Sequence, residues 1–149
     1  VIKSVIKSNQ NRSKLLLERL YGILNKKVKN KQITFLGVTF KANTDDMRDS
    51  PSLTMIPALV KKGAKIKYFD PTGYKKEFSK LKNVYNSSTI KESIIGSDFV
   101  IIHTEWNDFK SINFKNLVRG KKFIIFDMRN IYSAKKIRNQ GFKYYSIGR

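Results

Sequence analysis

The chain has 149 residues, of which 40% are hydrophobic, so it can bury the core of one ordinary domain. It contains no cysteine and a single histidine, His103, which excludes disulfides, cysteine nucleophiles and thiolate or histidine-rich metal sites within this chain. A formal net charge of +20 is typical of proteins that bind nucleic acid or an anionic membrane. However, the lysines flank nearly every predicted element, and no apolar run is long enough to span a bilayer.

Residues 2–25 are predicted to form one long amphipathic helix. Its apolar residues recur at helical spacing: Ile2, Ile6, Leu16, Leu20 and Leu24. A single helix of this length cannot bury its apolar face alone, so it must pack on the domain or on a partner. The polar and basic segment 25–31 that follows indicates a linker. We therefore expect a boundary near residue 30, between a helical region 1–30 and a domain 31–149.

Strand and helix patterns alternate through the rest of the chain. The strand-like runs are residues 33–38, 66–69, 99–104, 123–127 and 144–147. Helices are predicted between them, at residues 51–62, 90–95, parts of 111–118, and 133–140. Strands that alternate with helices pair in parallel through right-handed crossovers. The pattern therefore predicts an α/β fold with a Rossmann-like doubly wound parallel sheet, preceded by one long amphipathic helix.

Four polar or aromatic residues have a structural interpretation. The hydroxyl of Ser50 is predicted to cap the helix at residues 51–62. Asp70 precedes a proline and is expected to cap a turn, although it also stands where a Rossmann domain places the acid that binds a ribose. Trp106 is expected to pack under the next helix in preference to stacking on a base, and His103 is expected to be a hydrogen-bonded core residue.

Three cationic side chains follow predicted strands. In an open parallel sheet, ligands bind beyond the carboxyl ends of the strands. Lys41 and Arg48 come after the first strand and Arg129 follows the run at 123–127, so all three are expected at one edge of the sheet. Their ammonium and guanidinium groups suit a phosphorylated ligand. The loop after the first predicted strand lacks the glycines of G-x-G-x-x-G and is not a P-loop. This site would therefore bind phosphate with side chains, whereas those motifs bind it with backbone N–H groups.

The same residues have a structural alternative. Lys41 and Arg48 could pair only with the three aspartates of their own solvated loop. Arg129 could serve to neutralise Asp127 at the end of its strand, and Phe40 could be a core aromatic residue. The sequence leaves these alternatives open beside the ligand-binding interpretation.

Four segments make the sequence recognisable. They are ITFLGVTFKANTDDMRDSPS at residues 33–52, YFDP at 68–71, SDFVIIHTEW at 97–106 with Phe109, and FDMR at 126–129. With these segments, residues 31–149 closely resemble the C-terminal UDP-binding domain of the UDP-glucose 6-dehydrogenase (UDP-glucose/GDP-mannose dehydrogenase) family. Residues 1–30 resemble the end of the central helix of that family, which typically forms the dimer contact.

The resemblance implies a specific activity and specific site residues. Members of this family oxidise C6 of a UDP-sugar from alcohol to carboxylate and reduce NAD⁺ through a covalent cysteine intermediate. Phe40, Lys41 and Arg129 match positions that contact the substrate, and Arg48 matches a position that contacts NAD. The family carries NAD mainly on an N-terminal domain and the cysteine in its central region. No catalytic residue is therefore expected here, and this chain alone is not expected to turn over.

The resemblance also implies partners and a location. We expect a UDP-sugar ligand, a homodimer through the N-terminal helix, a cytoplasmic location that the lack of cysteine also fits, and neither a specific nucleic acid nor a membrane partner. Three alternatives remain from the sequence alone. One is a basic nucleic-acid-binding domain, another is a purely structural dimerisation module, and the third is a related enzyme acting on GDP-mannose or a UDP-N-acetyl-hexosamine.

Overall fold

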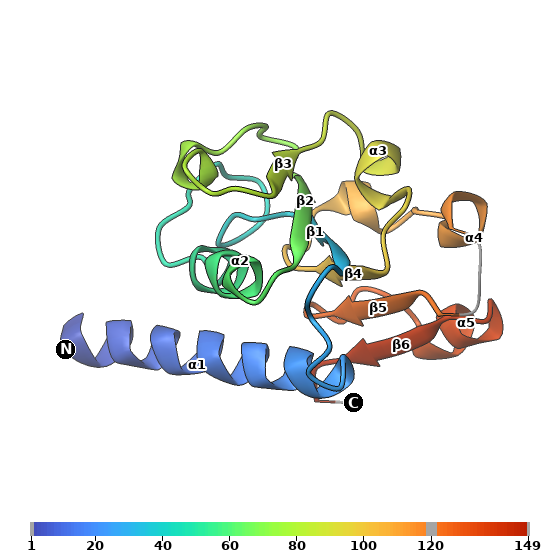
Figure 1. Ribbon diagram of the computed structural model, residues 1–149, viewed down its shortest axis with the longest axis horizontal. Coiled ribbons are helices and arrows are strands. Elements are labelled where there is room, and N and C mark those ends of the chain that lie inside the picture. The colour runs from blue at the N-terminus through green and yellow to red at the C-terminus, as the bar shows by residue number, and fades with distance from the viewer. Residues whose placement is uncertain (1, 119–121, 149) are drawn as a thin grey trace.

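The computed structural model describes the backbone of residues 2–118 and 122–148 and the side chains of residues 8, 10–118 and 122–148 (Figure 1). Its first element is helix α1 (Ile2–Ile23), as predicted. Two residues of the predicted apolar stripe, Ile2 and Ile6, have side chains outside the described part. The packing described for α1 is therefore that of its C-terminal half.

Six parallel strands form one sheet within the described residues. They are β1 (Gln32–Leu36), β2 (Lys65–Phe69), β3 (Val84–Asn86), β4 (Phe99–Ile102), β5 (Ile124–Asp127) and β6 (Lys143–Ser146). Their spatial order is β3-β2-β1-β4-β5-β6. The chain builds outward from β1 in one direction and then returns to place β4 on its other side, so the switch point lies between β1 and β4. The predicted doubly wound α/β fold is confirmed.

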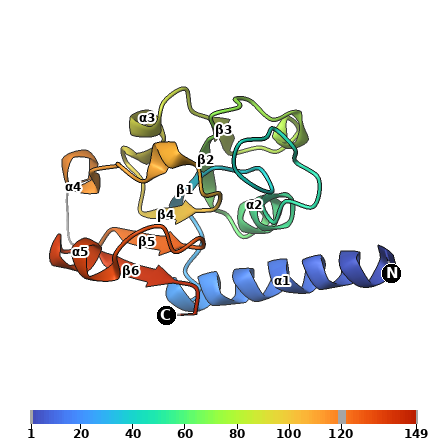
Figure 2. The same cartoon turned by 180° about the vertical axis from the view of Figure 1, so that it is seen from behind.

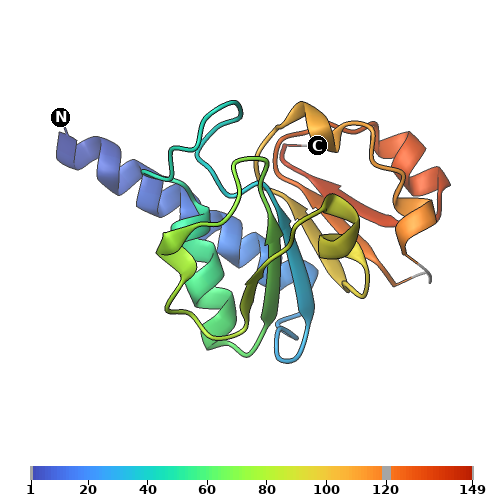
Figure 3. The ribbon, with the colours of Figure 1, turned by 90° about the horizontal axis from the view of Figure 1, so that it is seen from above.

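Helices cover both faces of the sheet (Figure 1 and Figure 3). One face is covered by α1 and α2 (Ser52–Lys61), and the other by α3 (Ile90–Ile94), α4 (Phe114–Leu117) and α5 (Ala134–Asn139). Short 3₁₀ turns stand at Lys76–Phe78 and Asn107–Phe109. Because side chains alternate across each strand, the central strand β4 supplies both cores: Phe99 and Ile101 to one, Val100 and Ile102 to the other.

The C-terminal half of α1 belongs to the first of these cores. Its leucines at positions 16, 17, 20 and 24 are buried with residues of α2 and the sheet. The guanidinium of Arg19 donates to the carbonyl of Ser146 at the end of β6 and lies 5.7 Å from the ring centroid of Phe126. Seen from behind in Figure 2, α1 runs beneath α2, its C-terminal part reaches the end of β6, and its N-terminal half projects past the sheet. Of the two predicted alternatives, this half packs on the domain.

Strands β1 and β4 end two residues earlier than predicted, β6 ends one residue earlier, and one strand was not predicted. Strand β1 ends at Leu36 because Gly37 turns the backbone with a φ of +76°, and β4 ends at Ile102. The unpredicted strand is β3, a three-residue edge strand. Within it Tyr85 is 57% exposed, so no alternating apolar pattern marks the strand in the sequence.

Helix α2 begins close to its predicted start. The Ser50 hydroxyl accepts a hydrogen bond from the backbone N–H of Ser52 at 3.3 Å and donates to the carbonyl of Val38 at 2.6 Å. The hydroxyl of Ser52 donates to the same carbonyl at 2.6 Å. The two serines therefore tie the start of α2 to the end of β1, which fixes both ends of the loop that carries the predicted site residues.

Candidate functional site

Arg129 joins three chain segments at the switch point of the sheet. It follows β5, and its Nε donates to the carbonyl oxygen of His103, which follows β4, at 2.9 Å. Its Nη2 donates to the carbonyl oxygen of Phe40, in the loop after β1, at 3.0 Å. A guanidinium carries five N–H donors, so these two bonds leave donors available to a ligand. Arg129 is thus held in place by the backbone of the sheet edge.

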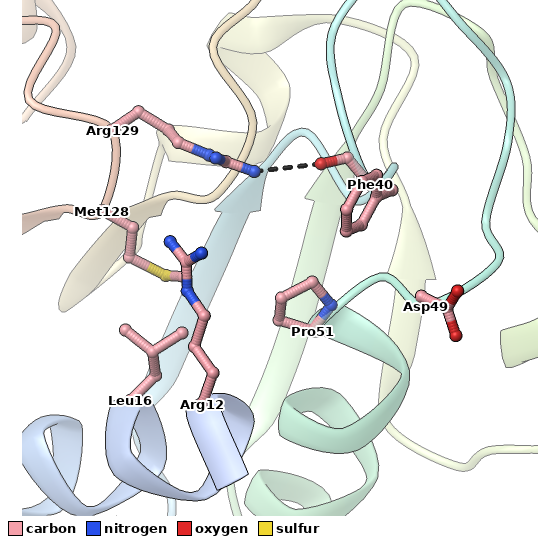
Figure 4. Close-up of a pocket in the computed structure, with 7 residues that line it drawn as sticks. All are labelled: Arg12, Leu16, Phe40, Asp49, Pro51, Met128 and Arg129. Atoms are coloured by element: carbon pink, nitrogen blue, oxygen red, sulfur yellow. Dashed lines mark hydrogen bonds between the residues drawn. The ribbon is translucent and has the colours of Figure 1, made fainter. Parts of the chain in front are cut away.

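A pocket of about 90 Å³ opens beside this guanidinium (Figure 4). Its lining comes from α1, from the loop between β1 and α2, and from the segment after β5: Arg12, Leu16, Phe40, Asp49, Pro51, Met128 and Arg129. In Figure 4, Arg12 rises from α1 toward Arg129, while the carboxylate of Asp49 points away from both. The pocket combines cations with an apolar floor and one aromatic side chain, a combination that suits a phosphorylated ligand with a flat ring.

The structure brings two of the four predicted site residues together in this pocket. Phe40 is 43% exposed at its rim, and Arg129 lines it. Lys41 follows Phe40 on the exposed loop without lining the pocket, and Arg48 lies farther along the same loop. The interpretation of Phe40 as a core residue does not fit its exposure.

Arg48 forms an ion pair with Asp46, as the structural alternative proposed. Its Nε and Nη2 donate to the two carboxylate oxygens at 3.0 and 2.9 Å. These side-chain bonds, with the bond from the Arg48 backbone, lower the pKa of Asp46 to about 2, and the charge of Lys41 acts in the same direction. The Arg48 side chain is 87% exposed. Such a surface pair contributes little to stability, so it leaves Arg48 free to exchange partners.

Two buried carboxylates, Asp70 and Asp127, accept hydrogen bonds at the ends of strands β2 and β5. Asp70 accepts the backbone N–H groups of Val38 and Thr72, both at 2.9 Å, and so caps the turn after β2 as expected. Asp127 accepts the backbone N–H of Arg129 at 3.0 Å and the hydroxyl of Tyr144 at 2.7 Å. The guanidinium of Arg129 reaches two backbone carbonyls and does not pair with Asp127. Neutralising that carboxylate is therefore not its role.

His103 and Trp106 are both buried. The Nδ1 atom of His103 lies 2.9 Å from the hydroxyl of Thr104, but Nε2 has no hydrogen-bond partner within the described residues. The expected hydrogen bonding of this histidine is thus met at one ring nitrogen. Trp106 packs in the second core, as expected, with its ring unavailable for stacking on a base.

Stability is expected to fall between pH 7 and pH 5 because of His103. Burial, together with the nearby charge of Arg129, lowers the pKa of His103 to about 3. An unfolded histidine titrates near 6.5, so the unfolded chain binds more protons throughout this range. The loss is about 2 kcal/mol at pH 5. Urea unfolding of the wild type and of His103→Gln at both pH values measures it, and parallel pH dependences in the two proteins would contradict the assignment.

Nowhere in residues 2–118 and 122–148 do three histidine, cysteine or acidic side chains gather closely enough to hold a metal ion. In the same ranges, no helix combines the length and apolar content that crossing a membrane would need.

Sequence reasoning assigned no binding role to five of the seven residues that line the pocket: Arg12, Leu16, Asp49, Pro51 and Met128. Arg12 and Leu16 are one helical turn apart and share a face of α1, which was a usable signal. The position of that face against the sheet edge, however, follows from tertiary packing. Met128 stands between Asp127 and Arg129, two residues that the sequence already places at the end of a strand.

The strand order and the position of the pocket define a Rossmann-like domain with a pocket beyond the carboxyl ends of the strands, where domains of this class bind ligands. Residues 34–134 match the UDP binding domain of the UDP-glucose/GDP-mannose dehydrogenase family, and the chain belongs to this family.

Named relatives fit this membership. UDP-glucose 6-dehydrogenase from Rickettsia bellii is 38% identical over 152 residues, covering 99% of this chain and 35% of the relative. UDP-glucose 6-dehydrogenase YwqF from Bacillus subtilis is 37% identical, with 100% and 34% covered. A solved UDP-glucose dehydrogenase from Pyrobaculum islandicum has a TM-score of 0.72 at 25% identity over 97% of this chain and 31% of that chain. This chain therefore spans about a third of these relatives.

Proposed function

We propose that this chain is the C-terminal UDP-sugar-binding part of an NAD-dependent UDP-glucose 6-dehydrogenase, an enzyme that oxidises UDP-glucose to UDP-glucuronate. The main structural support is the pocket at the switch point of the sheet, where two backbone carbonyls hold the guanidinium of Arg129 by hydrogen bonds. An anchored guanidinium loses little freedom when it binds a phosphate in a bidentate way. The relatives named UDP-glucose 6-dehydrogenase support the choice of sugar nucleotide.

In this proposal the side chains of the loop after β1 complete the substrate site. Phe40 offers an exposed ring at the rim of the pocket. Lys41 is adjacent on the loop and carries an ammonium group that can move onto a phosphate or sugar oxygen when the ligand arrives. The chain contains no cysteine, so it supplies binding and orientation and not the nucleophile of the reaction.

NAD would accept the hydride in this reaction. The described residues do not form a glycine-rich loop that could bind its pyrophosphate. A dinucleotide fingerprint uses glycines so that a backbone can approach a pyrophosphate. Here the position of a Cβ on Gly37 is occupied by Thr104, whose Cβ would lie 2.5 Å away. That glycine therefore serves packing. We propose that NAD is held mainly by a domain outside this chain, with exposed Arg48 as the contribution from this side.

We also propose that α1 takes part in a homodimer. Its N-terminal half projects past the sheet (Figure 1), and Leu15 on the described part of the helix is 65% exposed. The related solved UDP-D-ManNAc dehydrogenase from Pyrococcus horikoshii, with 27% identity and a TM-score of 0.67 over 93% of this chain and 30% of that chain, makes a UDP-N-acetyl-hexosamine the alternative substrate.

Lys41→Ala is expected to weaken UDP binding about tenfold, because a charge-assisted hydrogen bond contributes roughly 1.5–3 kcal/mol. Lys82→Ala is the matched control, since this exposed lysine precedes β3 and so lies at the opposite edge of the sheet. Calorimetric titration with UDP and UDP-glucose measures both variants. An equal loss in the two variants would mean that the general positive charge attracts the nucleotide, and the absence of UDP binding in the wild type would refute the proposed function.

A further inference from the structure

The pocket holds a second guanidinium that the proposed substrate site does not use. Arg12 stands on α1 one turn before Leu16, and both residues line the pocket. Buried Leu16 packs in the core, so it fixes the helix face from which Arg12 projects. Figure 4 shows Arg12 directed toward Arg129 from the opposite wall. Two arginines from segments far apart in the sequence thus share one small pocket.

Neither arginine forms an ion pair within the described residues. The ion pair within the described residues is that between Asp46 and Arg48, outside the pocket. The carboxylate of Asp49 points away from both guanidinium groups in Figure 4. Burial lowers the pKa of Arg129, and the charge of Arg12 lowers it further, against an opposing effect of Glu105. Like charges that line the same pocket repel, and an anion between them would offset that repulsion.

We propose that Arg12 and Arg129 form a paired site for a diphosphate group, so that a bound nucleoside diphosphate connects α1 to the ends of β1 and β5. Two planar guanidinium groups can each bind phosphate oxygens in a bidentate way, and together they match the charge of a diphosphate better than that of a single carboxylate. The inference rests on the proposed function for the nucleoside half of the ligand. It adds that α1 is part of the binding site.

The test compares Arg12→Gln with Lys14→Gln in the 149-residue chain. Lys14 is an exposed lysine two residues farther along α1, which places it on the opposite side of the helix. Calorimetry at physiological salt uses UDP, uridine and inorganic pyrophosphate as probes. We expect Arg12→Gln to weaken UDP and pyrophosphate binding about tenfold. Lys14→Gln should weaken them less than about twofold, because a screened distant charge contributes little. Uridine binding should not change in either variant.

A second measurement follows the helix itself. Addition of UDP to the wild type should shift the backbone amide signals of residues 12–16 in NMR spectra, and these shifts should be lost in Arg12→Gln. Because Arg12 is exposed, the variant should keep its fold, which circular dichroism checks.

The outcomes separate the inference from the proposed function. Equal UDP affinities in Arg12→Gln and Lys14→Gln would overturn the paired site and leave the proposed function standing. Pyrophosphate binding that depends on Arg12, without any preference for UDP, would support the paired site and refute a nucleotide function. If the wild type binds neither probe, both the paired site and the proposed function are wrong.

Discussion

Leu20→Ala is expected to lower the free energy of unfolding by about 3 kcal/mol, as truncation of a fully buried leucine does. The side chain of Leu20 has no exposed surface and packs with α2 and the sheet in the first core. Alanine keeps the helix, so the change removes packing and little else. Urea unfolding at neutral pH measures the effect.

Glu18→Ala is the control for this experiment. Glu18 lies on the same helix but is exposed, so its truncation should change stability by less than about 0.5 kcal/mol. A large difference between the two variants would mean that the second half of α1 is part of the folded domain. Equally mild effects would support the boundary near residue 30, with the helix as a separate unit.

The sequence was most informative where burial is continuous. The strands β4 and β5 are apolar on both faces, and this composition indicates central parallel strands without any knowledge of their neighbours. Strand β3 lacks that signal because it lies at the edge of the sheet, where one side is exposed and three residues suffice for pairing. Central elements could therefore be predicted from composition, whereas the edge strand is defined by its partner β2.

The residues of the candidate site likewise differ in how far the sequence could predict them. The rule that ligands bind at carboxyl ends of strands predicted that Lys41, Arg48 and Arg129 share one edge of the sheet, and of these three Arg129 lines the pocket. Phe40 also lines the pocket, but it was expected only from the family resemblance. The rule could not predict that Arg48 pairs with Asp46, because that contact depends on the local conformation of an exposed loop. Nor could it predict Arg12, since the periodicity of a helix gives its buried face but not its position along the sheet.

Gly37→Ala is expected to lower the free energy of unfolding by about 3 kcal/mol, from two separate effects. Gly37 has a φ of +76°, a conformation that costs an alanine about 1 kcal/mol or more. In addition, the new Cβ would lie 2.5 Å from the Cβ of Thr104, so the turn after β1 or the end of β4 must shift, which costs roughly 1–3 kcal/mol. Urea unfolding measures the total.

Gly73→Ala separates the two effects, because Gly73 has a similar φ of +89° but no heavy atom within 4 Å of the position that an added Cβ would take. It should lose only about 1 kcal/mol from the backbone conformation. The difference between the variants is then the cost of the contact with Thr104. Because the turn at Gly37 leads directly to Phe40, its displacement should also weaken UDP binding, whereas Gly73→Ala should not. Equal stabilities of the two variants would mean that the ends of β1 and β4 yield easily, and a sheet edge that yields so easily could not hold Arg129 rigidly against a ligand.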